Sequence, residues 1–92
     1  MAMIILTYRI MPESGEIEYS ELEKVSRETI EGYDSSVKIK SVEEYNVGFG
    51  LKAVKVYFSM DEKKGSDELE EKLRSLEQVG EVVIESMSRA LG

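Results

Sequence analysis

Residues 51–60 read LKAVKVYFSM, and the alternation within this run decides the fold that we expect. Apolar residues recur at every second position, which is the spacing of a β-strand with one face buried in a core. The residues that would point toward the core are Val54, Val56, Phe58 and Met60. Those that would point to the opposite face are Leu51, Ala53, Lys55, Tyr57 and Ser59.

The neighbouring segments predict another strand before this one and a turn after it. Residues 35–45 (SSVKIKSVEEY) alternate apolar and polar side chains between Val37 and Lys40. This pattern is typical of a half-exposed strand at the edge of a sheet, with lysines on its open side. Residues 46–50 (NVGFG) would connect the two strands, and residues 61–65 (DEKKG) would form a charged turn.

Residues 18–32 (EYSELEKVSRETIEG) have apolar side chains at helical spacing. Ser20 and Glu23 match a capping box, in which each side chain accepts a hydrogen bond from a free backbone N–H at the start of the helix. Gly32 supplies a C-terminal stop. The apolar stripe consists of Leu22, Val25, Thr29 and Ile30.

Residues 66–80 (SDELEEKLRSLEQVG) predict a second helix. Ser66 or Asp67 would cap it, and the acidic residues that follow suit the positive end of the helix dipole. We expect this helix to end at Gly80. Its apolar stripe consists of Leu69, Leu73, Leu76 and Val79.

Two more strands complete the expected fold. Residues 3–11 (MIILTYRIM) predict a central strand closed by Pro12, and residues 81–92 (EVVIESMSRALG) predict a final strand that runs into a short tail. The order β-α-β-β-α-β is that of a ferredoxin-like α+β sandwich, a four-stranded antiparallel sheet with two helices on one face. A length of 92 residues suggests a single domain spanning 1–92.

The charge and composition exclude several classes of function. A net charge of −7 makes nucleic acid a poor partner, because phosphate binding needs a concentrated basic patch. An acidic body can be steered toward a basic face of another protein, although the same charge also simply maintains solubility. The absence of Cys and His removes disulfides, thiolate nucleophiles, imidazole bases and zinc sites built on those residues, and it fits a cytosolic protein. The opening MAMIIL is too short for a membrane span and has no signal-peptide features.

The remaining candidate sites have competing interpretations. The Asp61–Glu62 pair lies beside two lysines, and we favour a solvated turn there over an acid–base pair. The loop MPESGEIE lies where an acylphosphatase would have its phosphate-binding loop, but its acidic residues would repel phosphate. Tyr8 and Tyr57 could form an RNA-binding platform on the sheet, but the charge gives it little support. A regulatory domain that binds a small molecule and dimerises through its sheet stays open.

Phe49 is the residue with the sharpest alternatives. It stands between Gly48 and Gly50, and the residues alone favour a turn whose aromatic packs over the sheet edge. The alternative is an exposed anchor for a partner protein, because a few large side chains dominate such interfaces. Arg89 is either a solvated terminal arginine or a charge that a rigid strand delivers to an anion site of a partner.

Four stretches carry a resemblance to a known family: TYRIMPES, VGFGLKAVKVYF, the acidic turn that opens the second helix, and ESMSRAL. Over essentially its whole length the chain resembles archaeal elongation factor 1-beta and the C-terminal guanine-nucleotide exchange domain of its eukaryotic relatives, without the N-terminal extension of the latter. The resemblance implies a cytoplasmic, non-enzymatic factor that promotes GDP-to-GTP exchange on elongation factor 1-alpha. It implies no cofactor or metal, and no direct contact with nucleic acid or membrane. We expect a monomer when the domain is free.

The resemblance also assigns roles to residues. Gly48, Phe49, Gly50 and Lys52 would contact the GTPase, with Phe49 in an apolar groove of its second domain. Arg89 would enter the nucleotide site beside the magnesium ion and the phosphate loop. Eukaryotic members carry a lysine at that place and often a second lysine where this chain has Ala53. An exposed Phe49 on the same side as the C-terminal tail would favour exchange, whereas a sealed dimer with a pocket at the loop would favour the regulatory domain.

Overall fold

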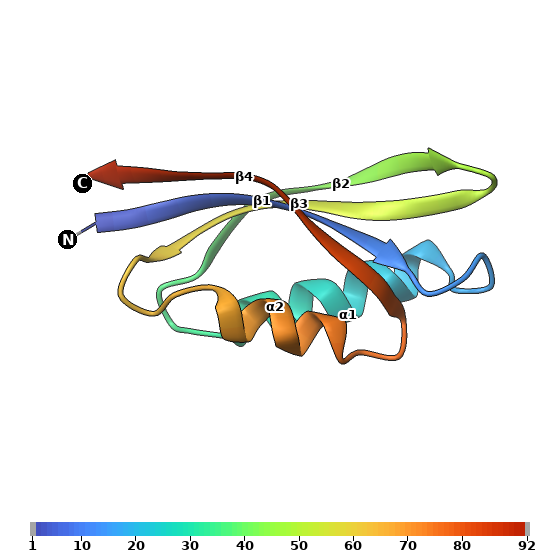
Figure 1. Ribbon diagram of the computed structural model, residues 1–92, viewed down its shortest axis with the longest axis horizontal. Helices are drawn as coiled ribbons and strands as arrows, with labels where there is room; N and C mark the ends of the chain where they lie inside the picture. The colour runs from blue at the N-terminus through green and yellow to red at the C-terminus, as the bar shows by residue number, and fades with distance from the viewer. Residues whose placement is uncertain (1, 92) are drawn as a thin grey trace.

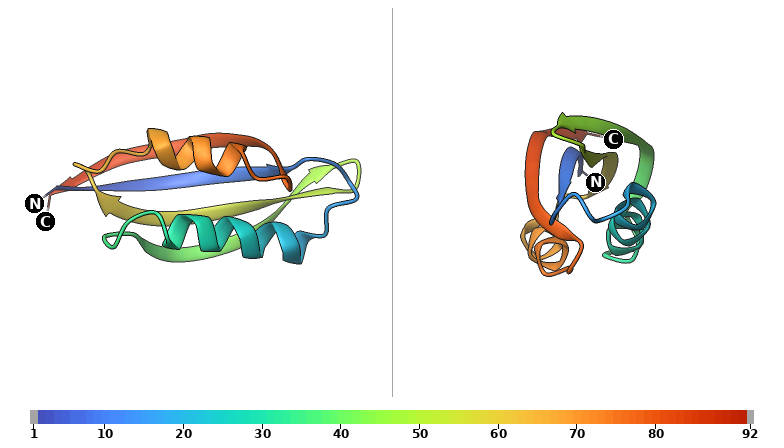
Figure 2. Two further views of the ribbon diagram at one scale, coloured as in Figure 1. Left: turned by 90° about the horizontal axis from the view of Figure 1, so that it is seen from below. Right: turned by 90° about the vertical axis from the view of Figure 1, so that its right-hand side faces the viewer.

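The computed structural model describes residues 2–91, which form a single antiparallel sheet covered on one face by two helices (Figures 1 and 2). The strands are arranged in the order β2-β3-β1-β4. This is the predicted ferredoxin-like architecture. The elements in chain order are β1 (Ala2–Pro12), α1 (Tyr19–Glu31), β2 (Lys38–Gly48), β3 (Leu51–Asp61), α2 (Asp67–Arg74) and β4 (Val79–Leu91).

The core lies between the helices and the central strands β1 and β3. The four β3 residues predicted to face inward are all fully buried, and their neighbours across β1 are Leu6, Tyr8 and Ile10, which are also fully buried. The rings of Tyr8 and Phe58 meet edge to face, with centroids 5.0 Å apart. Burying each large apolar side chain of this kind contributes about 1.5–3 kcal/mol, so these two strands supply much of the stability of the fold.

Helix α1 confirms the predicted apolar stripe only in part. Leu22, Ser26 and Ile30 are fully buried at four-residue spacing, whereas the other stripe residues are partly exposed. The predicted capping box is wrong, because the helix begins at Tyr19 and its N-cap is Glu18. Ser20 therefore already lies inside the first turn. The predicted C-terminal stop is confirmed, since Gly32 is the C-cap.

Helix α2 is shorter than predicted. Ser66 occupies the expected N-cap position, although its side chain makes no capping hydrogen bond. The helix ends at Arg74 rather than near Gly80. Two successive turns follow, in which Leu76 N–H donates to Leu73 and Val79 N–H donates to Leu76. A turn of this kind repeats roughly every three residues, so it continues the apolar spacing of the helix without continuing the helix itself.

The sheet positions the two ends of the molecule. Strand β2 is an edge strand, as predicted, and extends three residues beyond the predicted end at residue 45 to reach Gly48. Strand β4 is the other edge and remains paired as far as Leu91, which lies opposite Ala2. The predicted short tail is therefore strand up to residue 91, and Gly92 lies outside the described residues. Within residues 2–91, no helix is long and apolar enough to cross a membrane.

Candidate partner-binding site

The turn between β2 and β3 holds Phe49 out in solvent. Gly48 pairs with Leu51, so Phe49 and Gly50 form a two-residue hairpin loop. Both have positive φ angles, 56° and 77°, as in the type I′ turns whose twist matches paired strands. Among residues 2–91, Phe49 is the only residue other than glycine with a positive φ.

The phenyl ring of Phe49 does not pack against the core. Its relative exposure is 103%, which is complete. The interpretation of Phe49 as a packed turn residue is therefore wrong, for a physical reason: the φ signs of the turn direct its side chain away from the sheet. A left-handed conformation costs an ordinary residue about 1–2 kcal/mol, and the ring recovers none of this by burial. The glycines on both sides are suited to this turn, since Gly48 and Gly50 also have positive φ angles.

Lys52 follows the turn and forms an ion pair with a glutamate on the neighbouring strand. Its Nζ lies 3.4 Å from Glu44 Oε2, and both side chains are about half exposed. A pair as exposed as this one contributes only about 0–1 kcal/mol, so Lys52 can exchange Glu44 for another acidic group at little cost.

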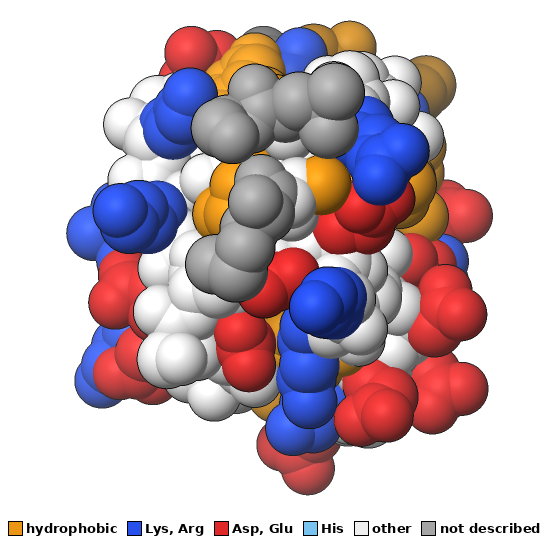
Figure 3. Space-filling view, turned by 90° about the vertical axis from the view of Figure 1, so that its left-hand side faces the viewer, with side chains coloured by type: hydrophobic (Ala, Val, Ile, Leu, Met, Phe, Trp, Pro, Cys, Tyr) orange, Lys and Arg blue, Asp and Glu red, His pale blue; other side chains and the backbone are white. Residues whose placement is uncertain are grey.

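Arg89 lies at the opposite end of the sheet, where it pairs with a glutamate from the turn after β3. Its Nε donates to Glu62 Oε2 at 3.1 Å and lies 3.0 Å from Glu62 Oε1, and its side chain is 61% exposed. Arg89 stands opposite Ile4 in the ladder between β1 and β4, so its backbone is fixed by the sheet. Figure 3 shows this end of the molecule, where basic and acidic side chains lie interspersed on the surface.

The structure does not bring Phe49 and Arg89 together. Arg89 is level with Met60 across the sheet, through Ile4, whereas Phe49 lies beyond Leu51 at the other end of β3. At about 3.3 Å per residue, the strand between those two β3 positions separates them by roughly 30 Å. Figure 1 shows the same arrangement, with the hairpin at one end of the long axis and the C-terminus at the other. The arrangement that would favour exchange is therefore present only in part, because Phe49 is exposed but lies at the opposite end of the sheet from the C-terminal tail.

A hollow of about 210 Å³ lies beside the hairpin and was not foreseen from the sequence. One wall is the loop between β1 and α1, and the other is the start of β3. Contact between the walls is close, since a Cβ placed on Gly15 would lie 3.7 Å from Leu51 Cδ2. The one feature of the sequence that could have indicated the hollow is the acidic loop, which from sequence alone served only to exclude a phosphate-binding loop. The lining residues are Pro12, Ser14, Gly15, Ile17, Glu18, Tyr19, Gly50, Leu51 and Lys52.

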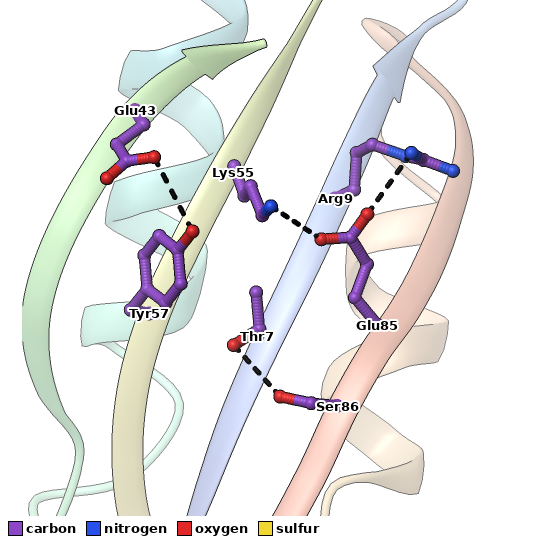
Figure 4. A network of polar contacts seen from close by, with 7 residues as sticks. All are labelled: Thr7, Arg9, Glu43, Lys55, Tyr57, Glu85 and Ser86. Atoms are coloured by element: carbon purple, nitrogen blue, oxygen red, sulfur yellow. Dashed lines mark hydrogen bonds and ion pairs between the residues drawn. The ribbon is translucent and has the colours of Figure 1, made fainter.

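The open face of the sheet carries a cluster of ion pairs and side-chain hydrogen bonds (Figure 4). Glu85 forms ion pairs with Arg9 at 3.1 Å and with Lys55 at 3.0 Å. Both cations also lie over the ring of Tyr45. The hydrogen bond to Glu85 raises the pKa of Lys55 above its ordinary value. Because Arg9 and Lys55 are already paired with a glutamate of the same chain, this face has little basic charge left to bind a phosphate backbone.

The aromatic platform considered for RNA is absent, because Tyr8 and Tyr57 lie on opposite faces of the sheet. Tyr57 is on the open face, where its hydroxyl lies 3.4 Å from Glu43. Tyr8 is fully buried on the helix side, and burial raises its pKa to about 12. RNA-binding sheets need their aromatics together on one exposed face, so the structure rules out this platform, which the charge already disfavoured.

The acidic pair Asp61–Glu62, at the end of β3 and the start of the turn that follows, has a structural role. Asp61 accepts a hydrogen bond from the backbone N–H of Lys63 at 2.9 Å, which shapes the turn, and Glu62 holds Arg89. Within the described part of the chain, no group of three or more Asp or Glu side chains could hold a metal ion. The sequence interpretation of this segment as a charged, solvated turn agrees with these contacts.

Comparison with known proteins identifies the family. The family model of the EF-1 guanine nucleotide exchange domain matches residues 5–90. The chain belongs to this family. Among curated relatives, it is similar to elongation factor 1-beta of Pyrobaculum aerophilum, with 39% identity over 90 residues that cover 96% of this chain and 95% of the relative. It is also similar to elongation factor 1-beta of Methanococcus maripaludis, with 34% identity over 96% of this chain and 98% of the relative.

Solved structures resemble this EF-1 exchange domain in fold alone. The ACT domain from GTP pyrophosphokinase of Chlorobium tepidum aligns with a TM-score of 0.63 and 18% identity, covering 87% of this chain and 95% of that one. The de novo designed protein Foldit4 aligns with a TM-score of 0.62 and 20% identity, covering 98% of both chains. One neighbour is a natural domain and the other a design, so the shared fold carries no function with it.

Proposed function

We propose that this protein is a guanine-nucleotide exchange factor that promotes GDP-to-GTP exchange on elongation factor 1-alpha during translation elongation. The observation that carries the proposal is Phe49, a fully exposed aromatic in a strained backbone conformation. A residue that costs free energy to hold and contributes nothing to the core is suited to partner binding. Membership of the exchange-domain family supplies the nature of the partner.

The two ends of the sheet have different tasks in this proposal. Phe49 is the anchor that inserts into an apolar groove of the GTPase, and Gly48 and Gly50 let the two backbones approach closely. Lys52 adds a polar contact beside the anchor. Arg89 enters the nucleotide site, some 30 Å away by the strand spacing, so the domain acts as a bridge between two regions of its partner.

Exchange requires no covalent chemistry by the factor. Bound GDP is held largely through its phosphates and a Mg²⁺ ion, and an arginine brought to that site competes with the metal for the phosphates. To reach the site, Arg89 must leave Glu62, which costs little because the pair is exposed. The affinity for GDP then falls, and by linkage bound nucleotide weakens the grip of the factor by the same ratio.

The decisive experiment measures release of fluorescent GDP from the cognate elongation factor 1-alpha, with excess unlabelled nucleotide, in the presence and absence of this protein. We expect the release rate to rise with the concentration of the factor and then saturate. A release rate that stays at its spontaneous value, while both proteins are folded, contradicts the proposal.

The hollow beside the hairpin bears on one other function, a regulatory domain that binds a small molecule at this loop and dimerises through its sheet. Its volume of about 210 Å³ lies below the range of roughly 300–1,000 Å³ that is usual for ligand pockets. Sedimentation analysis separates the two functions, since the exchange factor is expected to be a monomer when free and the regulatory domain a dimer.

A further inference from the structure

We propose that the hollow between the β1–α1 loop and the hairpin receives a lysine or arginine side chain of the same GTPase that binds Phe49. This inference rests on the proposed function and assigns to the partner a chemical feature that it must present. The hollow and Phe49 share the hairpin, because Gly50 and Leu51 line one wall of the hollow and directly follow Phe49. A single surface of the partner can therefore meet both.

The shape of the hollow suits one long side chain. Ile17, Tyr19 and Leu51 line it, and each is only partly buried, so the free protein leaves apolar surface uncovered there. Lysine and arginine have aliphatic stems that pack on apolar walls while the charged head stays near water. A volume of about 210 Å³ is small for a drug-sized ligand, which favours a side chain.

The charge around the hollow selects a cation. Glu18 lines the hollow, whereas Glu13 and Glu16 lie on the same loop outside the lining, and the sequence has no basic residue between positions 10 and 23. Across residues 2–91, no Lys or Arg comes within 4.0 Å of these three carboxylates, whereas Glu44 holds Lys52 of the lining. The positive end of the α1 dipole is equivalent to roughly half a charge and offsets only part of this field. A basic side chain of the partner would be attracted here.

Such a contact would fix the orientation of the domain on its partner. An anchor with one aromatic ring leaves rotation about that ring, and a rotation of roughly 10° at the hairpin displaces a point 30 Å away by about 5 Å, more than a catalytic or competing group can tolerate. A second contact beside Phe49 removes that freedom. The hollow thereby sets the direction in which Arg89 is presented.

The charge is tested by the double variant Glu16→Gln/Glu18→Gln, with Glu28→Gln/Glu31→Gln at the far end of α1 as the matched control. Both pairs change the net charge by the same amount, and all four side chains are exposed. We expect the first variant to weaken binding of elongation factor 1-alpha about threefold to tenfold at low ionic strength, with the difference shrinking at high salt, as for exposed charge pairs. The control should bind as the unaltered protein does.

The space is tested by Gly15→Leu, with Gly15→Ala as its control. A Cβ at this position meets only an ordinary contact with Leu51, so both variants should fold, and thermal unfolding checks this. Leucine should fill the hollow and weaken binding at every salt concentration, while alanine should have little effect. The inference is overturned if Gly15→Leu and Glu16→Gln/Glu18→Gln both bind with the affinity of the unaltered protein. It is also overturned if the difference in affinity between the charge variant and the unaltered protein does not shrink at high salt. These outcomes leave the proposed function standing, whereas failure of the unaltered protein to bind or accelerate GDP release overturns both.

Discussion

Phe49 and Arg89 differ in how the fold holds them. The backbone of Phe49 is fixed by a two-residue turn, while its ring is free in solvent. Arg89 has its backbone fixed in a strand and its head held by Glu62. The sequence located both residues but could not decide whether Phe49 was packed, because a glycine–aromatic–glycine run does not reveal the sign of φ at its centre. Its exposure required the register of the hairpin, in which Gly48 faces Leu51.

Phe49→Ala should weaken the complex with elongation factor 1-alpha by about 2 kcal/mol or more, roughly thirtyfold in Kd, as truncation of an aromatic anchor usually does. Calorimetric titration measures this. The free domain should be as stable as before, since the ring is fully exposed. Unchanged affinity in a folded variant would remove Phe49 from the interface.

Arg89→Ala should slow stimulated GDP release more than it weakens binding, because the proposed mechanism uses its charge at the nucleotide site rather than for affinity. Stopped-flow GDP release at saturating factor, compared with the Kd of the complex, separates the two effects. Arg89→Lys should restore much of the rate, since it keeps the charge. Equal release rates for Arg89→Ala and the unaltered protein would exclude the role.

The elements show where periodicity in a sequence is informative and where it is not. Strand β3 was predicted correctly because alternation over ten residues has no helical explanation. The end of α2 was predicted wrongly because Leu76 and Val79 continue the helical spacing through two turns. The predicted N-cap of α1 was also wrong, since Ser20 and Glu23 satisfy a capping motif in sequence while the actual N-cap, Glu18, lies two residues earlier. The hollow escaped prediction because its walls are 30 to 40 residues apart in the chain.

Gly80 allows β4 to pass the end of β1 and should not tolerate a side chain. A Cβ there would lie 2.8 Å from the carbonyl oxygen of Pro12 and 3.1 Å from Glu13 Cα, and backbone atoms cannot move aside as side chains do. Gly80→Ala should therefore destabilise the domain by about 1–3 kcal/mol, the usual cost of overpacking. Denaturant unfolding measures the change, with Gly15→Ala as the control. A variant as stable as the unaltered protein would contradict this account.

At the scale of the whole molecule, the long sheet separates Phe49, the proposed anchor, from Arg89, the residue proposed to act on the nucleotide. The molecule measures 42 Å along its longest axis and only 20 and 17 Å across. The fold class, the order of the elements along the chain and the edge position of β2 followed from the sequence. The separation of Phe49 from Arg89 did not, because it depends on the pairing of β1 with both β3 and β4.

This separation predicts that the two residues contribute independently to the free energy of the complex. Changes more than about 7–10 Å apart without shared partners usually add to within 0.3–0.5 kcal/mol. The Kd values of Phe49→Ala, Arg89→Ala and the double variant form a thermodynamic cycle that measures the coupling. A coupling energy well above that limit would show that the sheet, or the GTPase, transmits a conformational change between its ends.

The pairing of the first and last strands also determines the order in which the fold can form. Pairing Gly48 with Leu51 closes the hairpin over a loop of only two residues. Hairpins of this kind form on the order of microseconds. Pairing Ala2 with Leu91 must instead close a loop of almost the entire chain, whose entropic cost is paid only after other contacts exist. The folding pathway should therefore complete the hairpin early and dock β4 late. The surface proposed to recognise the GTPase would then exist before the strand that carries Arg89 is in place.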